Sequence, residues 1–445
     1  MTRMVLALIM LAGCPMDPAG PPADLGETNP GPGPDPTTNP DPDPDPDPDP
    51  DPDPGPITIS NLAWANNPTF LGPFSVTWDQ SAAGAVYVEY QVDGEWLRTP
   101  TIDGEMGTNE TTVIGVPAAT TAPYRVTLAD GSASVNGSSE LEALPVPAGL
   151  PMPNLQVNEP AEWAPSGKYV LLPINEFNDA YLIIMDRDGR VVWATGGSNI
   201  LYAELSASGD GLLWGDTDRD RAYRSYLDER IADFETRGHY HAMAGLPDGT
   251  IVWDGGSTLY ELPPGATSRQ EIWSSSNISY INGITYDPLS DRFAVSAFST
   301  QSIAILDRPT GDPLWSAPGM PGIDIYSFQP TTAELNNQHG IEFLANGNLL
   351  ASSIDNGTGT VWLREYVIDD NEMAMREVWN FDSGYGDVSW SWAHRLPSGN
   401  TLHTLGPTGR VYEVTPDGEV AWRATYDNWL GRCQVIDDLY TLVAP

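Results

Sequence analysis

The residues of this chain best suited to acid–base or nucleophilic chemistry are five histidines: His239, His241, His339, His394 and His403. A neutral imidazole attacks electrophiles and exchanges protons near pH 7. Two of the five share one spacing, since His241 lies eight residues before Gly249 and His339 lies eight residues before Gly347. Each glycine belongs to an Asp-Gly or Asn-Gly dipeptide, which favours a tight turn between strands. The shared spacing indicates a repeated structural unit that places both histidines at one position.

An aromatic repeat supplies that unit. The residues that close successive short apolar runs are Trp193, Phe234, Trp273, Trp315, Trp379 and Trp422. Their intervals are 41, 39, 42, 64 and 43 residues. A period near 40 with several strands per unit is typical of a β-propeller. Six aromatic positions predict six blades over residues 154–445, with the aromatic side chains packed between blades.

The repeat predicts where the histidines lie. The shared position opens the innermost strand of a blade, so we expect His241 of blade three and His339 of blade five to face the central channel. The alternative is that both are structural histidines without a catalytic role. His239, two residues before His241, is expected to share its face and to help bind the substrate. Ser391 is the equivalent residue in blade six, and strand alternation places His394 on the opposite face as a structural residue.

The remaining histidine and a metal site complete the possibilities. His403 lies in the second strand of its blade and is given no role. A metal held by His239, His241 and His339 is an alternative, but no acidic or cysteine ligand is clearly placed with them. We therefore expect no metal and no other cofactor.

Other features of the repeat concern its loops. The 64-residue interval contains an insertion around residues 317–337. Insertions in such repeats map to loops on one face, which is often the functional face. Residues 432–443 are expected to supply the strand that closes the ring. The predicted turns lie at residues 188–189, 248–249, 346–347, 398–399 and 417–418.

Residues 57–147 form a different pattern of short alternating strands. The strands are expected at residues 74–78, 86–90, 112–116 and 124–128. This pattern resembles a fibronectin type III or immunoglobulin-like β-sandwich. Trp78 and Tyr124 are expected in its core rather than in contact with a ligand. A proline-rich stretch from Pro145 to Pro153 marks the boundary with the propeller.

The N-terminus has the pattern of an export signal. Residues 1–13 combine Arg3 with a short apolar run. The run Leu11-Ala12-Gly13-Cys14 resembles a bacterial lipobox, which implies cleavage before Cys14 and lipidation of its thiol. The alternative is an ordinary signal peptide with a chance cysteine. We expect a protein of the cell envelope, anchored by lipid to the outer membrane and facing the periplasm or the cell surface.

Residues 14–56 are expected to form a disordered acidic tether. Seven Asp-Pro pairs run from Asp41 to Pro54. Proline restricts the backbone to extended conformations, and the aspartates repel one another. We therefore expect the tether to extend by about 3.1 Å per residue along its length. Calcium binding by these aspartates is an alternative, but a mobile tether lacks a preformed oxygen cage.

The composition excludes one class of partner. The chain has 61 acidic and 20 basic residues, for a formal net charge of -41. Such a surface repels phosphate backbones, so no nucleic-acid partner is expected. Contact with a membrane is expected through the lipid anchor only. Cys433 is the one cysteine besides Cys14, so a disulfide framework is not expected.

An ordered set of motifs carries a family resemblance. The motifs are residues 239–249, 282–288, 338–350, 355–357 and 395–402. Together they resemble the bacterial arylsulfotransferases that work without a nucleotide sulfate donor. The resemblance implies a six-bladed propeller that moves a sulfuryl group from an aryl sulfate to a small phenol through a sulfohistidine. It also implies that His339 is the nucleophile and His241 the acid or base, with Asn282 and Tyr280 orienting the substrate.

Two positions depart from that family pattern. Tyr280 stands where the family has a histidine, and Phe298 stands where the family tends to have an arginine. Loss of one preorganised donor typically costs on the order of 10²–10³ in rate. Arg364 is a possible substitute cation for binding the sulfate, and the alternative is a surface ion-pair partner. The competing hypothesis is a non-catalytic ligand-binding or scaffold propeller lipoprotein.

Overall fold

The computed structural model describes residues 55–176, 179–386 and 390–445. The predictions for the signal peptide, for lipidation of Cys14 and for nearly all of the tether lie outside these residues. The described chain is nearly all β, which confirms the predicted fold class. Among the described residues, no helix combines the length and the apolar character needed to cross a bilayer.

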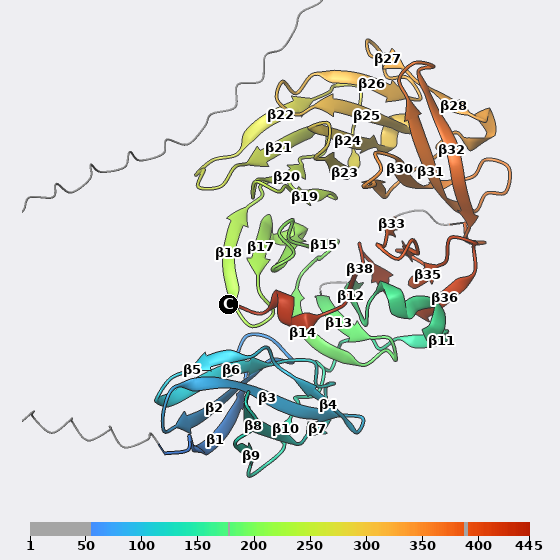
Figure 1. Ribbon diagram of the computed structural model, residues 1–445. Helices are drawn as coiled ribbons and strands as arrows, with labels where there is room; N and C mark the ends of the chain where they lie inside the picture. The colour runs from blue at the N-terminus through green and yellow to red at the C-terminus, as the bar shows by residue number, and fades with distance from the viewer. Residues whose placement is uncertain (1–54, 177–178, 387–389) are drawn as a thin grey trace, which may run out of the picture. The chain divides into compact units, whose positions relative to one another are not determined.

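Residues 59–142 form a sandwich of two main sheets (Figure 1). One sheet contains β1 (Ile59–Asn66), β2 (Phe74–Gln80) and β6 (Gly107–Val113). The other contains β4 (Glu95–Arg98), β3 (Gly84–Val92), β8 (Tyr124–Leu128), β9 (Ser134–Asn136) and β5 (Ile102–Gly104). A short pair, β7 (Thr121–Ala122) and β10 (Leu141–Glu142), accompanies them.

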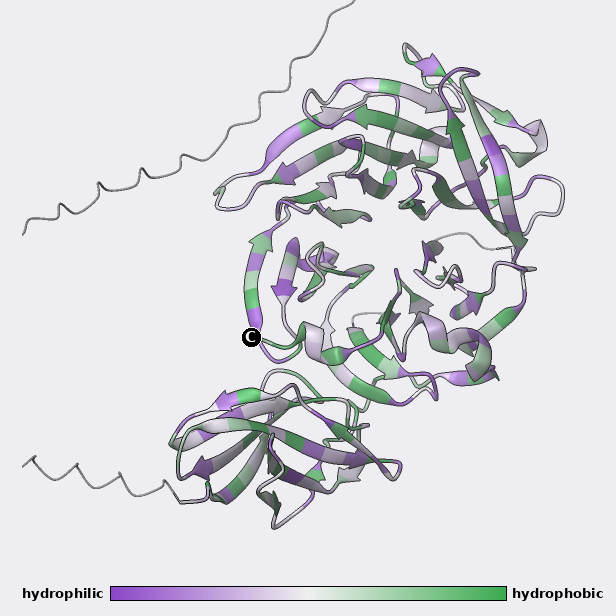
Figure 2. Cartoon of the chain, viewed as in Figure 1, coloured by the Kyte–Doolittle hydropathy of each residue, from purple (hydrophilic) through white to green (hydrophobic). Residues whose placement is uncertain are grey.

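The sandwich core follows from strand alternation. Buried and part-buried residues alternate along β2, and Figure 2 shows the matching alternation of hydrophobic and hydrophilic residues on the sandwich strands. Trp78 and Tyr124 are both buried in this core, as expected.

Six sheets surround a central axis and form the propeller (Figure 1). Blade one contains β38 (Gln434–Ile436), β37 (Trp429–Leu430), β12 (Tyr169–Glu176), β13 (Asp179–Asp186) and β14 (Val191–Gly197). Blade two contains β15 (Tyr202–Leu205), β16 (Leu212–Asp216), β17 (Arg221–Ser225) and β18 (Arg230–Glu235). Blade three contains β19 (Met243–Gly245), β20 (Ile251–Asp254), β21 (Thr258–Leu262) and β22 (Gln270–Ser274).

Each blade in the second half of the ring has five strands, as blade one has. Blade four contains β23 (Ile281–Asp287), β24 (Arg292–Ala297), β25 (Ser302–Asp307), β26 (Pro313–Ala317) and β27 (Asp324–Ile325). Blade five contains β29 (Ile341–Phe343), β30 (Leu349–Ile354), β31 (Val361–Asp369), β32 (Ala374–Asp382) and β28 (Ser327–Gln329). Blade six contains β33 (Trp392–Arg395), β34 (Thr401–Leu405), β35 (Arg410–Val414), β36 (Val420–Thr425) and β11 (Asn154–Asn158).

Helices are few and short. In the described part of the chain, the one α-helix is α1 (Pro160–Trp163). The 3₁₀ turns among the described residues are η1 (Ala164–Ser166), η2 (Thr217–Arg219), η3 (Phe298–Thr300), η4 (Thr331–Ala333) and η5 (Leu439–Leu442).

The ring closes at two places. The C-terminal strand β38 pairs with β12 and becomes the inner strand of the first blade, as expected for residues 432–443. At the other edge, β11 pairs with β36 and adds an outer strand to the last blade. The C-terminal end of the propeller sequence therefore completes blade one, and its N-terminal end completes blade six.

The aromatic repeat occupies the outer strands as predicted. Trp193, Trp273, Trp315 and Trp422 are buried in hydrophobic clusters that each join two neighbouring blades. The glycines of the five predicted turns all have φ between +81° and +93°. This left-handed region is open to glycine without steric cost, which is why these positions form tight turns between neighbouring strands.

The insertion around residues 317–337 differs from its prediction. It was expected as loops on one face, but it contributes two short edge strands. β27 pairs in parallel with β26, and β28 pairs in parallel with β32. The insertion therefore extends the outer edges of blades four and five before the chain returns to the centre.

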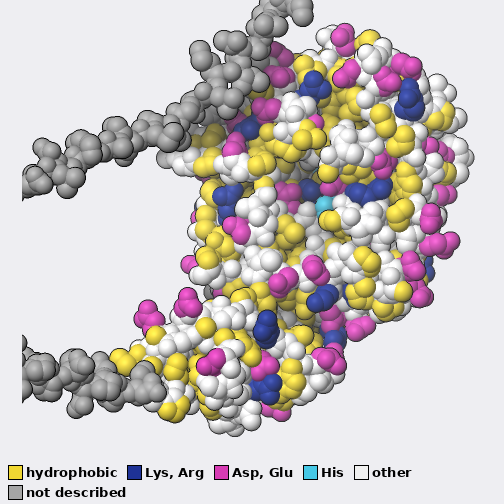
Figure 3. Space-filling model, viewed as in Figure 1, with side chains coloured by type: hydrophobic (Ala, Val, Ile, Leu, Met, Phe, Trp, Pro, Cys, Tyr) yellow, Lys and Arg dark blue, Asp and Glu magenta, His cyan; other side chains and the backbone are white. Residues whose placement is uncertain are grey.

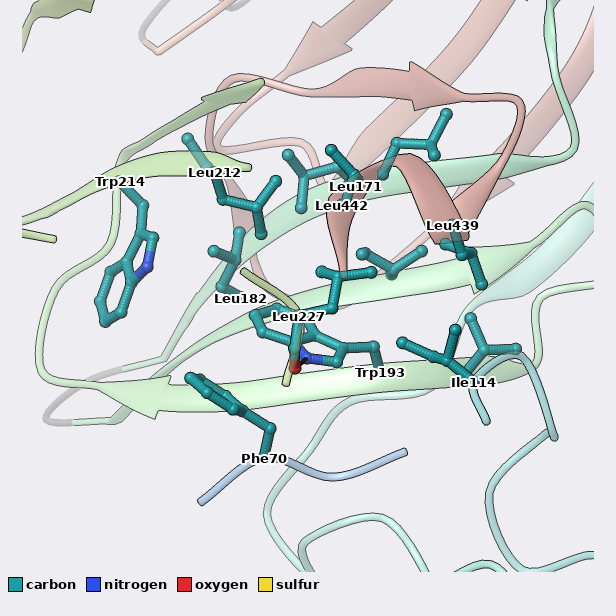
Figure 4. Close-up of a cluster of buried hydrophobic side chains, with 14 of the residues drawn as sticks. Phe70, Ile114, Leu171, Leu182, Trp193, Leu212, Trp214, Leu227, Leu439 and Leu442 are labelled. Atoms are coloured by element: carbon teal, nitrogen blue, oxygen red, sulfur yellow. Dashed lines mark hydrogen bonds between the residues drawn. The ribbon is translucent and has the colours of Figure 1, made fainter. Parts of the chain in front are cut away.

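The sandwich packs against blade one (Figure 4). Phe70 of the sandwich stacks on Trp193 of β14, with ring centroids 5.4 Å apart. Leu71 and Ala194 exchange backbone hydrogen bonds. The Tyr440 hydroxyl, near the C-terminus, donates to the Tyr90 hydroxyl at 3.2 Å. These contacts put the sandwich and the propeller in one folded unit.

Candidate functional site

His241 and His339 meet at the centre of the ring. Their ring centroids lie 5.5 Å apart, although the two residues come from blades three and five. His339 is 5% exposed and His241 is partly exposed. Each residue lies just before the inner strand of its blade, as the repeat predicted. The pair is therefore an arrangement of two imidazoles that only the closed ring creates.

Backbone contacts hold both histidines in place. The backbone N–H groups of His241 and Ala242 donate to one carboxylate oxygen of Asp254 at the end of β20, with the His241 bond at 2.8 Å. The backbone N–H of His339 donates to the Ser352 carbonyl of β30 at 3.0 Å.

Two glycines allow the inner strands to approach closely at His339. A Cβ on Gly340 would lie 2.6 Å from the Trp392 Cα of blade six. A Cβ on Gly283 of blade four would lie 2.7 Å from the His339 carbonyl oxygen. Blades four, five and six therefore converge on the backbone of this histidine.

Burial keeps both imidazoles neutral. It lowers the pKa of His241 to about 4. It also lowers the pKa of His339 well below its ordinary value, with a further contribution from the neighbouring His241. Loss of hydration disfavours the charged imidazolium, so at neutral pH each ring keeps one unprotonated nitrogen. The pair has the protonation state that nucleophilic attack requires.

Aromatic rings extend from this pair on both sides. Successive rings in contact are Tyr280, Tyr240, His241, Trp390 and Trp429, which we call the aromatic arc. Tyr280 stacks on Tyr240 with centroids 5.4 Å apart, and Tyr240 lies 4.4 Å from His241. Trp390 lies 6.3 Å from His241 and 4.4 Å from Trp429.

The outer members of the aromatic arc are open to ligands. Tyr240, Tyr280 and Trp429 are each more than two-fifths exposed. Phe298 is 40% exposed, and its backbone N–H donates to the Tyr280 carbonyl. Flat aromatic molecules stack well on such faces.

Asn282 supports the pair through the backbone. Its side-chain amide donates to the Gln338 carbonyl at 2.8 Å, directly before His339 in the chain. Its side-chain oxygen accepts from the Ser296 hydroxyl at 2.7 Å. The buried amide thus ties β23 to the segment that carries His339.

Arg364 is not brought to the pair. It lies in β31, which β30 separates from the inner strand β29. Its guanidinium, 3% exposed, pairs with Asp355 at 2.6 Å and with Glu377. The positive charge is therefore neutralised within blade five.

The other histidines have separate surroundings. His239 is buried against blade two, where a Cβ on Gly215 would lie 2.7 Å from its ring. Burial lowers the pKa of His239 to about 3. His403 is also buried, and its Nε2 lies 2.9 Å from the Ser391 hydroxyl. Ser391 thus points between blades five and six, where its hydroxyl also contacts Ser352.

His394 lies on the channel side, contrary to expectation. Its Nδ1 lies 2.7 Å from a Glu342 carboxylate oxygen on β29. The charge of Arg432, which follows β37 of blade one, also acts on Glu342. Arg432 in turn pairs with Glu204 at 3.1 Å. Figure 3 shows acidic and basic side chains and a histidine gathered near the centre of the face in view.

No metal site emerges from the described part of the chain, because no group of three His, Cys, Asp or Glu side chains there is arranged to hold an ion. His239, His241 and His339 do not form such a group.

Sequence reasoning missed several residues of the site. Tyr240, between two of the histidines, and Trp390, directly before the blade-six position, were both next to residues already considered. Asp254, whose carboxylate binds the backbone at His241, lies at the end of the neighbouring strand. Burial raises its pKa to about 7. Adjacency to the repeated position was the only available signal for all three.

Comparisons with known proteins give distant structural likenesses. No protein-family model matches the chain, and no curated protein matches it. A protein of unknown function from Bacteroides caccae has a TM-score of 0.43 and 17% identity, and the alignment covers 59% of this chain and 94% of that protein. A catalytically inactive virginiamycin B lyase from Staphylococcus aureus has a TM-score of 0.40 and 11% identity. That alignment covers 64% of this chain and 100% of the lyase. TolB from Acinetobacter baumannii has a TM-score of 0.43 and 14% identity. That alignment covers 72% of this chain and 80% of TolB. The lyase and TolB are β-propeller-like proteins, and with TM-scores below 0.5 these likenesses carry no argument about this chain.

Proposed function

We propose that this protein is an arylsulfotransferase-type enzyme that moves a sulfuryl group from an aryl sulfate to a phenol. The observation that carries the proposal is the pair of neutral imidazoles, His241 and His339, 5.5 Å apart beside exposed aromatic rings. A neutral imidazole supplies the nucleophile, and stacking on the aromatic arc supplies binding energy for flat phenolic rings.

The reaction has two balanced halves. A ring nitrogen of His339 attacks the sulfur, an S–N bond forms, and the S–O bond to the aryl group breaks. The released phenolate takes up a proton from solvent. An acceptor phenol then gives its proton to solvent, its oxygen attacks the same sulfur, and the S–N bond breaks to restore neutral His339.

The neighbouring residues take supporting parts in this proposal. Tyr280 faces the ligand from the aromatic arc, with a hydroxyl that donates hydrogen bonds. Asn282 acts indirectly, because its amide bonds to the Gln338 carbonyl and to Ser296.

A second function, ligand binding without chemistry, is favoured by the paired state of two cations. Arg364 pairs with Asp355 and Glu377 within blade five. Arg432, whose guanidinium lies 5.2 Å from the Trp392 ring, pairs with Glu204. An anionic sulfuryl group gains most from fixed donors or cations that are free to face it.

The deciding experiment measures transfer from an aryl sulfate to a phenol by wild type, His339→Ala and His394→Gln. We expect His339→Ala to lose at least about 10²-fold in kcat, as removal of a nucleophile does. His394→Gln serves as the matched histidine control with retained activity. Mass spectrometry of the donor-treated protein should find one added SO₃ group on the peptide containing His339.

Two results would decide against the enzyme. Unchanged transfer by His339→Ala removes His339 from the mechanism. Saturable binding of a phenol to wild type, with no transfer and no added SO₃ group, leaves the ligand-binding function in its place.

We also propose that the protein acts in the cell envelope, anchored through Cys14. The lipobox-like residues 11–14 support this proposal. Incorporation of labelled fatty acid should be lost in Cys14→Ser, and equal labelling of both proteins would contradict the anchor.

A further inference from the structure

Trp390 makes a directional contact with the histidine pair. Its indole N–H donates to Nε2 of His241 at 3.0 Å. An indole nitrogen is a donor only, so Nε2 of His241 must be the acceptor. A neutral imidazole carries one proton, and burial keeps His241 neutral at pH 7. The proton of His241 therefore resides on Nδ1.

The backbone of Trp390 gives an independent observation. Its φ is +54°, in the left-handed region that bulky residues rarely adopt. Such conformations persist where the surrounding structure holds them, and they are concentrated at functional sites. Trp390 also packs edge-on against Trp429 of blade one, with centroids 4.4 Å apart. The strained backbone and this contact together hold the indole N–H against His241.

We propose that Trp390 is a positioning residue that holds His241 in the Nδ1–H tautomer and so divides the work between the two histidines. The lone pair of His241 Nε2 is engaged by the indole, so this atom neither attacks sulfur nor accepts a proton while the bond persists. His241 instead offers a hydrogen bond through Nδ1–H. The nucleophile of the pair is therefore His339.

The free donor of His241 supports this division. Nδ1 is buried and has no hydrogen-bond partner among the described residues. A buried donor without a partner is costly, so water or a ligand oxygen is expected to accept this proton. The tautomer depends on the structure alone, whereas its part in sulfuryl transfer rests on the proposed function.

The test is direct observation of the imidazole protons in the full chain. The protein contains only five histidines, so ¹⁵N-histidine labelling yields few signals. His241→Gln identifies the signals of His241 by their disappearance. Long-range ¹H–¹⁵N correlation spectra then show which ring nitrogen carries the proton. The variant is Trp390→Phe, which keeps an aromatic ring and removes the donor, and the matched control is Trp429→Phe.

We expect the Nδ1–H pattern for His241 in wild type and in Trp429→Phe, and a change toward Nε2–H in Trp390→Phe. An Nε2–H pattern in wild type overturns the proposal, and so does an unchanged pattern in Trp390→Phe. If sulfuryl transfer occurs, Trp390→Phe should lower kcat by about 10²-fold, the size of a proton-donor effect. The expected spectra without any transfer would leave the tautomer standing and remove the proposed function alone.

Discussion

The buried histidines have an energetic consequence beyond catalysis. Burial lowers the pKa of His239 to about 3, of His241 to about 4 and of His403 to about 3. Burial lowers the pKa of His339 as well. In the unfolded chain each of these groups titrates near 6.5. These four histidines therefore bind protons in the unfolded state at pH values where they remain unprotonated in the folded state.

This difference predicts acid-sensitive stability. Where the unfolded chain binds more protons, stability decreases as pH is lowered, by up to about 1.4 kcal/mol per pH unit for each histidine that is fully protonated in the unfolded chain. The loss begins near pH 6.5 and continues downward. Three carboxyl groups oppose it, because burial raises the pKa of Asp254 to about 7 and raises the pKa of Glu204 and Asp186 as well, which favours folding as pH falls. Four histidines act against these three groups.

The measurement is the urea midpoint at pH 7.5, 6 and 5, above the range where surface carboxylates titrate. We expect a steady decrease. His239→Asn, which keeps a side chain of similar shape without a titrating ring, should show a shallower decrease. A midpoint that is level from pH 7.5 to 5 would contradict the assignment of four neutral buried histidines.

At the scale of elements, the inner strands decide where side chains meet. Strand alternation predicted opposite directions for Ser391 and His394, and they are opposite. The direction assigned to the channel was wrong for blade six, because Ser391 packs between blades while His394 reaches Glu342. A repeat predicts position along a strand reliably, but local twist and neighbouring side chains set which face is the channel face.

The backbone conformation of Trp390, just before β33, can be tested by substitution. If Trp390 is held in the left-handed region, glycine there should relieve strain that alanine retains. We expect Trp390→Gly to be more stable than Trp390→Ala by about 1 kcal/mol, the reverse of the usual order. Both variants lack the indole, so the comparison isolates the backbone, and urea unfolding measures it. Greater stability of Trp390→Ala would show that φ is not positive in solution.

At the scale of the whole molecule, closure and domain contact involve the same parts of the chain. The C-terminal strand β38 completes blade one, and η5 after it reaches the sandwich through Tyr440. Asp228, between β17 and β18, joins three segments. Its carboxylate accepts from the Thr112 hydroxyl at 2.8 Å and from the Ala444 N–H at 2.9 Å. Its carbonyl accepts from Asn67 at 2.8 Å.

Asp228→Ala should therefore destabilise the sandwich and propeller together. Loss of the carboxylate leaves two donors unpaired in a partly buried interface, for about 1–3 kcal/mol. Asp233→Ala is the control, since its exposed ion pair with Arg221 at 3.5 Å should be worth less than about 1 kcal/mol. Calorimetry should show one lower transition for Asp228→Ala. Equal melting of the two variants would mean that this contact carries no stability.

The sequence by itself determined the periodic features of this protein. The aromatic interval and the turn glycines predicted six blades, because each blade repeats the same local geometry. The same repeat placed His241 and His339 at equivalent positions of two blades. Such inferences succeed when the physical cause, strand period or turn conformation, lies within a few neighbouring residues.

Only the tertiary structure decided how these positions are used. It brought the two histidines within 5.5 Å, paired Arg364 with acidic residues of its own blade, and set the Trp390 indole on His241. The residues in contact at Trp390 and His241 are 149 positions apart in sequence. No local pattern encodes such a contact, because it depends on the ring closing and on the direction each side chain takes within it.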